Sequence, residues 1–163
     1  MPRLSPIIIL AVTCLIFFLP DQLHATHNRA GEITIEQVGD CVNSLTVMAT
    51  IITYSKASSV SADRDSLEIC WGDGRCEYVY RTNGPIVAGF QKGERLENDV
   101  KKNIYIAFHT FPARGTFSIT MTDPNRNGGI LNVNFPNSEM IRFHLKTTYT
   151  FPNPQFQGCN NTP

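Results

Sequence analysis

This 163-residue sequence has no net charge, little helical periodicity and few long apolar runs. Lysine and arginine together number 14, as do aspartate and glutamate, so the formal net charge is zero. A chain without a basic excess lacks the electrostatic footprint of a nucleic-acid or anionic-lipid binder, and we expect neither as a partner. No segment places apolar residues at helical spacing over a useful length, which argues against a helical fold.

The local signatures of common enzymes are also missing from the sequence. It contains no G-x-S-x-G, no H-E-x-x-H and no phosphate-binding loop. His27, His109 and His144 lack the spacing of metal ligands, and the cysteines that remain after export can all pair. We therefore expect a protein that is not an enzyme and that uses no cofactor or metal. A secreted hydrolase whose site is assembled from distant residues stays open as an alternative.

The N-terminus has the three parts of a secretory signal. Arg3 provides a basic start, the run from Ile7 to Leu19 is apolar, and Ala25 is a small residue suited to cleavage before Thr26. The run is shorter than the roughly 20 residues of a membrane span, with an uncleaved anchor as the alternative. We expect a signal peptide at 1–25 and a single domain at 26–163 that is secreted, extracellular or on the outer cell surface. No membrane insertion is expected after cleavage.

The most informative segment is Cys70–Cys76, with the sequence CWGDGRC. Its Asp-Gly pair lies between two runs rich in β-branched and aromatic residues, which is a hairpin signal because glycine adopts the positive φ of a tight turn. Cysteines just outside such a turn face each other, which predicts a disulfide between them. Cys41 and Cys159 then remain as a second pair by elimination, although two free thiols or a partner outside the chain fit equally well.

Alternation of apolar and polar residues with a period of two recurs along the chain. Phe117, Ile119 and Met121 form one face of a segment whose other face carries hydroxyl groups, as in a strand packed on one side. The pattern predicts an all-β antiparallel sandwich of about seven strands. The expected strands are 31–38, 44–54, 67–71, 76–81, 104–108, 116–122 and 141–151. A surface excursion is expected at 83–102 and an irregular loop at 123–138.

Two loops contain acidic and amide side chains that could bind an ion. Asp123, Asn125 and Asn127 stand at alternate positions, like the first half of a calcium loop, but the twelfth position is Asn134 rather than an acidic residue. We expect these side chains to cap their own backbone, with calcium binding as the alternative. The carboxylates of Asp63–Asp65 lie in a serine-rich loop and are expected to be solvated.

Three segments in the same order resemble the signature of PKD-type domains, which have an immunoglobulin-like β-sandwich fold. They are Trp71-Gly72-Asp73-Gly74, His109-Thr110-Phe111 and the strand that begins Gly115-Thr116-Phe117. Phe111 and Phe117 stand where the family has tyrosine, so we do not expect the tyrosine-to-backbone hydrogen bond that the family uses near this corner. The resemblance implies a PKD-like, immunoglobulin-like sandwich.

Three residues of this signature allow a functional and a structural interpretation. Trp71 could be a sugar platform, but a tryptophan packed on a disulfide is a known core device of sandwiches, which we favour. Asp73 could be a metal ligand or an acid, yet aspartate before glycine commonly accepts backbone N–H groups within its turn. His109 is expected to hydrogen-bond across the corner rather than to catalyse.

A broader similarity covers nearly the whole mature chain. The segments 26–34, 123–127, 136–138 and 157–163 resemble parts of large exported surface proteins of gliding bacteria, associated with gliding motility and type IX secretion. The similarity implies an N-terminal domain, standing alone or cut from a longer protein. Its functional residues are not well defined, so no catalytic residue can be carried over.

These observations together predict a structural spacer or adhesion module at the cell surface. Its expected partners are other domains of the same protein, or surface glycans and proteins. A secreted carbohydrate-binding module is the alternative, and it would need exposed aromatic residues grouped on one sheet or loop edge. The candidates for that group are Tyr78, Tyr80 and Phe90.

Overall fold

The computed structural model describes residues 28–59, 63–153, 155 and 159–161, so the expected signal peptide at 1–25 lies outside the described residues. In chain order the elements are β1 Asn28–Gln37, β2 Thr46–Lys56, β3 Ser66–Cys70, β4 Cys76–Tyr80, β5 Ile86–Val87, β6 Phe90–Gln91, β7 Glu94–Leu96, β8 Val100–Thr110, β9 Thr116–Asp123, η1 Ser138–Met140 and β10 Phe143–Thr150. None of the helical structure in the described residues is long and apolar enough to cross a membrane.

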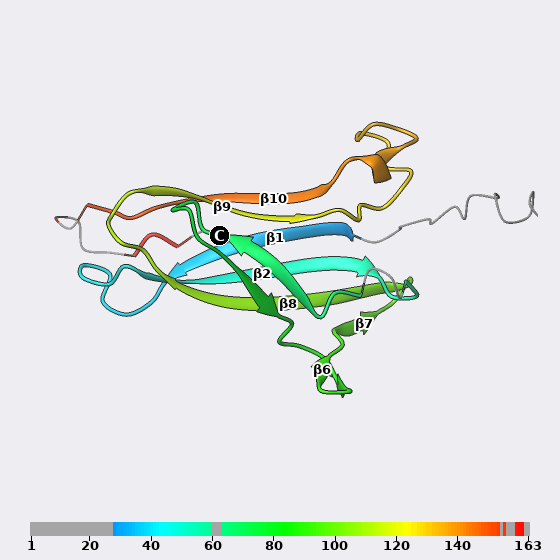
Figure 1. The fold of residues 1–163 in the computed structure, drawn as a ribbon, viewed down its shortest axis with the longest axis horizontal. Helices are drawn as coiled ribbons and strands as arrows, with labels where there is room; N and C mark the ends of the chain where they lie inside the picture. The colour runs from blue at the N-terminus through cyan, green and yellow to red at the C-terminus, as the bar shows by residue number, and fades with distance from the viewer. Residues whose placement is uncertain (1–27, 60–62, 154, 156–158, 162–163) are drawn as a thin grey trace, which may run out of the picture.

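The strands form two four-stranded sheets that pack face to face (Figure 1). One sheet has the order β1-β2-β8-β7 and the other β10-β9-β3-β4, with antiparallel pairing throughout. Lettered in chain order, these are the A-B-E-D and G-F-C-C′ sheets of an immunoglobulin-like sandwich. The prediction of an all-β antiparallel sandwich is therefore confirmed.

The predicted number of strands is wrong, because the described residues contain ten strands rather than about seven. All seven predicted strands are present, and the three additional ones lie in the expected excursion 83–102. β5 and β6 form a separate hairpin, whereas β7 pairs with the first residues of β8. Strands of two or three residues are too short to show a period-two pattern, so the sequence could not reveal them.

Alternation in the long strands builds the core. β2 buries every second residue, so that Val47, Ala49 and Ile51 face the opposite sheet. Ile69 and Ile119 meet them from β3 and β9, and both are fully buried. Burial of side chains of this size contributes about 1.5–3 kcal/mol each, which explains why a one-residue slip of register is not tolerated.

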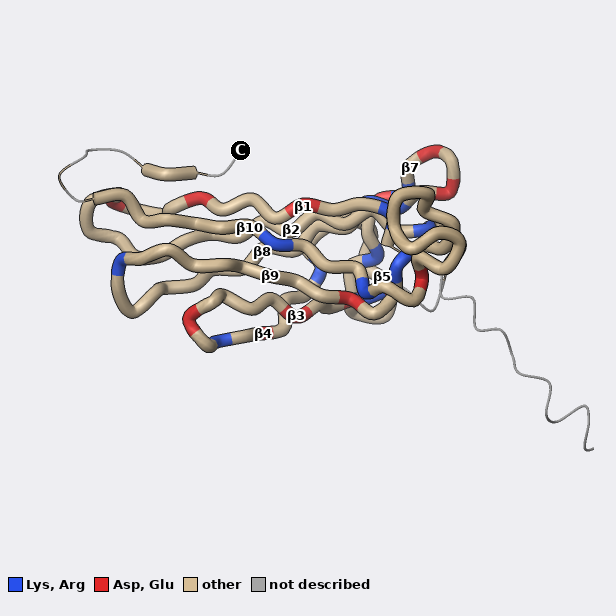
Figure 2. Tube along the Cα trace, turned by 90° about the horizontal axis from the view of Figure 1, so that it is seen from above, with Lys and Arg blue, Asp and Glu red and all other residues tan. Residues whose placement is uncertain are grey.

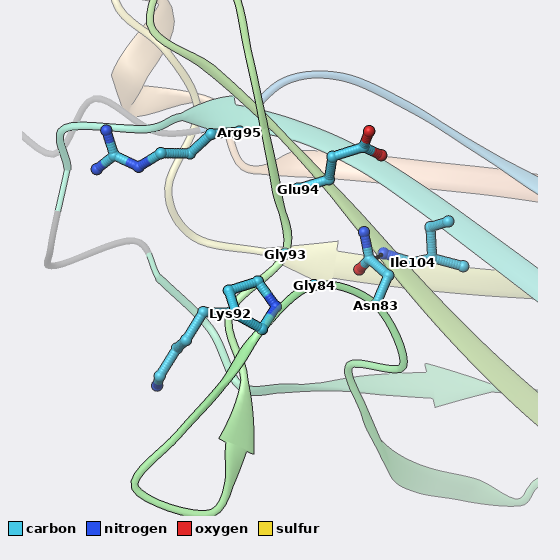
Figure 3. Close-up of a pocket in the computed structure, with 8 residues that line it drawn as sticks. Asn83, Gly84, Lys92, Gly93, Glu94, Arg95 and Ile104 are labelled. Atoms are coloured by element: carbon cyan, nitrogen blue, oxygen red, sulfur yellow. Dashed lines mark hydrogen bonds between the residues drawn. The ribbon is translucent and has the colours of Figure 1, made fainter.

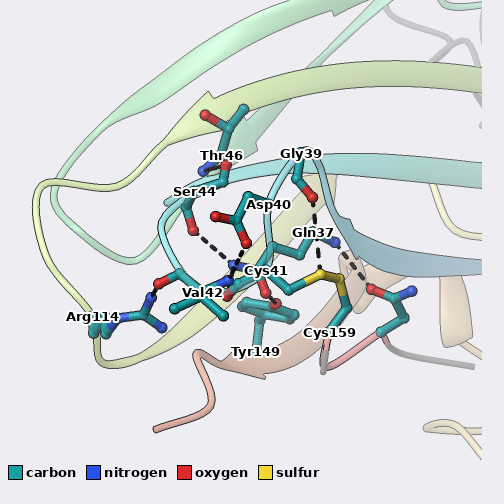
Figure 4. The surroundings of a disulfide bond; sticks show 11 residues. Gln37, Gly39, Asp40, Cys41, Val42, Ser44, Thr46, Arg114, Tyr149 and Cys159 are labelled. Atoms are coloured by element: carbon teal, nitrogen blue, oxygen red, sulfur yellow. Dashed lines mark hydrogen bonds between the residues drawn. A yellow bond between two sulfur atoms is a disulfide. The ribbon is translucent and has the colours of Figure 1, made fainter. Parts of the chain in front are cut away.

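Residues 159–161, beyond β10, are fastened to the end of β1 and to the β1–β2 loop (Figure 4). Cys159 forms a disulfide with Cys41, with their Cα atoms 5.0 Å apart. The backbone N–H of Gln37, at the end of β1, donates to the Asn161 side chain at 3.1 Å. Arg114 adds donated hydrogen bonds to the carbonyl groups of Val42 and Pro152. The second expected cysteine pair is thus present, and it ties the segment after the last strand to the loop after the first strand.

Candidate functional site

The segment Cys70–Cys76 forms the turn between β3 and β4, with its two cysteines paired in register and joined by a disulfide. Asp73 Oδ1 accepts the backbone N–H of Arg75 at 3.0 Å, which closes the turn. Gly72 has a φ of +81°, and a Cβ atom there would lie 2.6 Å from the carbonyl oxygen of Ser118. This turn therefore needs glycine both for its backbone conformation and for its close approach to β9.

Trp71 lies in the core rather than on the surface, because only 1% of the residue is exposed. Its ring stacks on His109 with centroids 4.6 Å apart and planes 10° apart, and it meets the edge of Phe111 at 6.3 Å. The indole Nε1–H donates to Glu77 Oε1 at 2.9 Å. A residue this enclosed has no free ring face for a ligand, so Trp71 is not a sugar platform.

His109 and Asp73 join the turn to β8. His109 Nε2 lies 2.8 Å from Asp73 Oδ2, and the two side chains are 9% and 3% exposed. Burial acts to raise the pKa of Asp73, but the hydrogen bonds from His109 and from the Arg75 backbone outweigh it, so the pKa lies below its usual value. An ionised carboxylate held this way fixes the turn in place. The three signature segments meet here as one packed corner.

The Asn-rich loop after β9 uses its side chains locally. Asp123 Oδ1 accepts the backbone N–H of Asn125 at 2.7 Å, and Asp123 Oδ2 pairs with Arg64 at 3.2 Å. Asn127 donates to the carbonyl oxygen of Gly128. No group of three or more His, Cys, Asp or Glu residues that could hold a metal ion occurs in the described parts of the chain.

The expectation that the two loop carboxylates are solvated is wrong for Asp63, whereas the side chain of Asp65 stays partly exposed, at 30%. Asp63 Oδ1 accepts hydrogen bonds from Arg81 at 2.6 Å and Lys101 at 2.5 Å, and these two cations are 1% and 6% exposed. Asp65 pairs with Lys92 at 2.8 Å. Burial acts to raise the pKa of Asp63, but the bonds from Lys101 and Arg81 prevail and lower it. Figure 2 shows that charged residues gather at this end of the molecule.

One signal in the sequence could have revealed this network. Lys101 and Asn103 lie an even number of residues before Tyr105 and Ala107, which are the inward residues of β8, so they share the same inward face (the same parity along the strand). Polar groups at inward positions need buried partners. Asn103 donates to the Thr53 and Ser55 hydroxyl groups, and Tyr105 donates to the carbonyl oxygen of Arg64. What the sequence does not show is which residues those partners are.

A surface group of three aromatic residues, here called the aromatic platform, consists of Tyr78, Tyr80 and Phe90. They are 69%, 62% and 43% exposed. Tyr78 and Tyr80 are two residues apart on β4 and share its outer face, since Val79 between them points inward. The rings of Tyr80 and Phe90 lie 6.3 Å apart with planes 27° apart. These are the residues that the sequence singled out as surface candidates, and two elements bring them together.

The part of the excursion that carries Phe90 begins at Gly84 and ends at Gly93, and these two close-lying ends are here called its neck. A cavity of about 480 Å³ opens beside the neck (Figure 3). At the neck the backbones of Gly84 and Gly93 cross, and a Cβ atom on Gly84 would lie 2.1 Å from the Gly93 carbonyl oxygen. Asn83 fastens the neck to β8, because its side chain accepts the N–H of Ile104 and donates to the carbonyl oxygen of Lys102. The sequence contains no signal for this cavity, since it depends on the close approach of Gly84 to Gly93 and on the bonds from Asn83 to β8.

The sequence and the structure were compared with known proteins. No family model, curated protein or solved structure matches this chain. The PKD-like resemblance therefore rests on its three sequence segments. Function must be argued from the surface of the domain itself.

Proposed function

We propose that this chain is a non-enzymatic module of the extracellular space or outer cell surface, and that it acts by adhesion through the aromatic platform. The observation that carries the proposal is the exposure of Tyr78, Tyr80 and Phe90 as one group. Exposed aromatic rings that lie together on one surface are typical of binding sites.

The expected environment agrees with this role. Two disulfides persist in oxidising compartments, as outside the cell. A PKD-like or related module in an exported surface protein would be held rigid by its core and by both disulfides. Such a scaffold can also act as a spacer between other domains of the same protein. Only the platform distinguishes an adhesive module from a passive spacer.

A surface glycan is the second candidate for what the platform binds, and it would make the chain a carbohydrate-binding module. The near-parallel rings of Tyr80 and Phe90 favour this ligand class, because flat aromatic faces stack on the apolar faces of sugar rings. Lys92 lies with its ammonium group 5.6 Å from the Phe90 ring centroid and adds a donor at the margin. Asp65 also accepts from Lys92, so the donor is held in position.

A glycan array and a cell-binding assay with the secreted protein test the proposal. Tyr80→Ala and Tyr78→Ala should each weaken saturable binding by about tenfold, because stacking contacts contribute roughly 1.4 kcal/mol or more. Phe135→Ala is the matched control, since Phe135 is 59% exposed but lies outside the platform. Binding to cells without binding to glycans would assign the platform to a protein ligand. Binding unchanged in both tyrosine variants would refute the platform, and no binding at all would leave a spacer.

A further inference from the structure

The edge of β8 is unpaired over Ile106–Thr110. On the side away from β2, β7 pairs only with Val100 to Lys102, and Arg81 forms an isolated bridge with Tyr105. From there to Thr110 no strand within the described ranges pairs with this edge. Five consecutive residues of a central sandwich strand therefore have one neighbour rather than two.

The register of β8 identifies which backbone groups are directed to this open side. Phe111 donates its N–H to Leu45 on the β2 side, whereas Ile104 donates to Asn83 and accepts from Thr82 on the opposite side. Because the direction alternates along a strand, the N–H and C=O groups of Ile106, Phe108 and Thr110 point to the open edge. Such a row of alternating donors and acceptors matches the backbone of another extended chain.

The open edge of β8 also lacks the features that normally prevent strand pairing. Natural edges carry charges, proline or bulges. The other edge strands of the two sheets follow this rule: β1 has Arg29, Glu32 and Glu36 with a register shift after Asn28, β4 has Glu77, β7 has Glu94 and Arg95, and β10 has Lys146. Over 106–110, by contrast, the outward side chains are Ile106, Phe108 and Thr110, and no bulge or proline occurs.

A cavity of about 300 Å³ lies beside this edge. Its lining residues come from the end of β8, the β3–β4 turn and the start of β4: Trp71, Arg75, Cys76, Glu77, Phe108, His109 and Thr110. The volume is at the lower end of the range of about 300–1,000 Å³ found for small-ligand pockets. Glu77 is engaged by Trp71, whereas Arg75 is exposed and forms no ion pair with any described residue. Arg75 is therefore a cation at the mouth of the cavity that a ligand can pair with, and the carboxylate of Glu77, which among the described residues accepts a bond only from the neutral indole, lies beside it.

We propose that the open edge of β8 binds an extended peptide segment of another protein, which adds as a strand along Ile106–Thr110. One of its side chains enters the cavity, and an acidic side chain pairs with Arg75. Strand addition gives affinity through the backbone and specificity through alternate side chains. A second copy of this chain fits less well, because β4 lies beside the same edge and two copies would bring their β4 strands together. Figure 2 shows β4 as the outermost strand on its side.

A phage-displayed library of linear peptides of about seven residues is the probe, used against the secreted protein with both disulfides formed. We expect enriched sequences to alternate β-branched residues and to carry an aspartate or glutamate. Ile106→Lys places a charge on the edge and should weaken binding of the selected synthetic peptide by about tenfold or more. Thr50→Lys is the matched control, because Thr50 is the direct β2 partner of Ile106 on the same outer face but lies one strand inward. Arg75→Glu should shift the selection from acidic to basic residues.

Amide hydrogen exchange locates the bound peptide. The amides of Ile106, Phe108 and Thr110 should exchange quickly in the free protein and slow by about tenfold with peptide, while Ala107 and His109 are slow in both states. Three outcomes would overturn the proposal: no enrichment over the Ile106→Lys variant, protection elsewhere in the sandwich, or a dimer that Ile106→Lys abolishes. The last would assign the edge to a second copy. The aromatic platform uses different variants, so either proposal can fail without the other.

Discussion

Replacement of Asp63 by asparagine tests how the charged end of the sandwich is held together. Asp63 lies between Arg81 and Lys101, at 2.6 and 2.5 Å, and both cationic side chains are almost fully buried. Asparagine keeps the shape of the side chain but removes its charge. Two buried cations would then face each other without a counter-ion, and removal of one partner from a buried pair is strongly destabilising.

The size of the effect follows from the two bonds and from the exposure of the carboxylate. Hydrogen bonds to charged groups contribute about 1.5–3 kcal/mol each, so two of them set a range of about 3–6 kcal/mol. The Asp63 side chain is 24% exposed, so water could reach the two cations in the variant and partly replace the lost interactions. We therefore expect the free energy of unfolding to fall by about 3 kcal/mol, at the lower end of that range.

Asp65→Asn is the matched control, because Asp65 belongs to the same loop but pairs with Lys92 where both side chains are 30% exposed. An ion pair this exposed contributes less than about 1 kcal/mol. Urea unfolding at neutral pH, with both disulfides intact and the slope compared between variants, measures each cost. Equal costs for the two variants, or a cost for Asp63→Asn below about 0.5 kcal/mol, would refute the reasoning.

Three further predictions concern acid stability, the neck and the disulfides. Because the pKa of Asp63 is lowered in the folded state, its contribution is complete above its unfolded value of about 4 and is lost as the pH falls through the folded value; acid unfolding of Asp63→Asn should therefore depend less on pH below about 4. Gly84→Ala should cost about 3 kcal/mol in urea unfolding, and Gly89→Ala, with a similar φ but no atom within 4 Å, about 1 kcal/mol; equal costs would contradict the crossing of the neck. Removal of the Cys41–Cys159 bridge, with a sequence separation of 118, should lower the free energy of unfolding by about 5 kcal/mol. Removal of Cys70–Cys76, with a separation of 6, should lower it by about 2 kcal/mol. Thermal unfolding of the paired serine variants gives the order of the two costs, and the reverse order would contradict the prediction.

The accuracy of the sequence-based prediction followed the length and regularity of each strand. β2 alternates without interruption over Thr46–Lys56, and it was predicted with small errors at its ends. β8 was predicted only from 104 to 108, because Lys101 and Asn103 occupy inward positions where apolar residues were expected. Asp63 was misjudged for a related reason. Arg81, the partner of Asp63, is 18 residues away in sequence, and no local pattern connects them.

The candidate sites divide in the same way. Exposure of Tyr78 and Tyr80 follows from the parity of β4, but their grouping with Phe90 depends on a hairpin that folds back beside β4. Trp71 was assigned to the core from its position beside a cysteine, yet its stacking on His109 required β8 to pass under the turn. Parity is a property of one strand, whereas contacts between strands depend on the arrangement of the whole sheet.

The sequence by itself determined the all-β class, the seven main strands and the β3–β4 hairpin. These depend on period-two alternation and on turn residues, which act within a few residues of the chain. The tertiary structure alone decided which polar groups are buried together and which edge remains open. β7 stops after three residues and Arg81, just after β4, forms a bridge only with Tyr105, so no strand of the described residues pairs with the outer edge of Ile106–Thr110. That outcome depends on long-range pairing, which local chemistry does not specify.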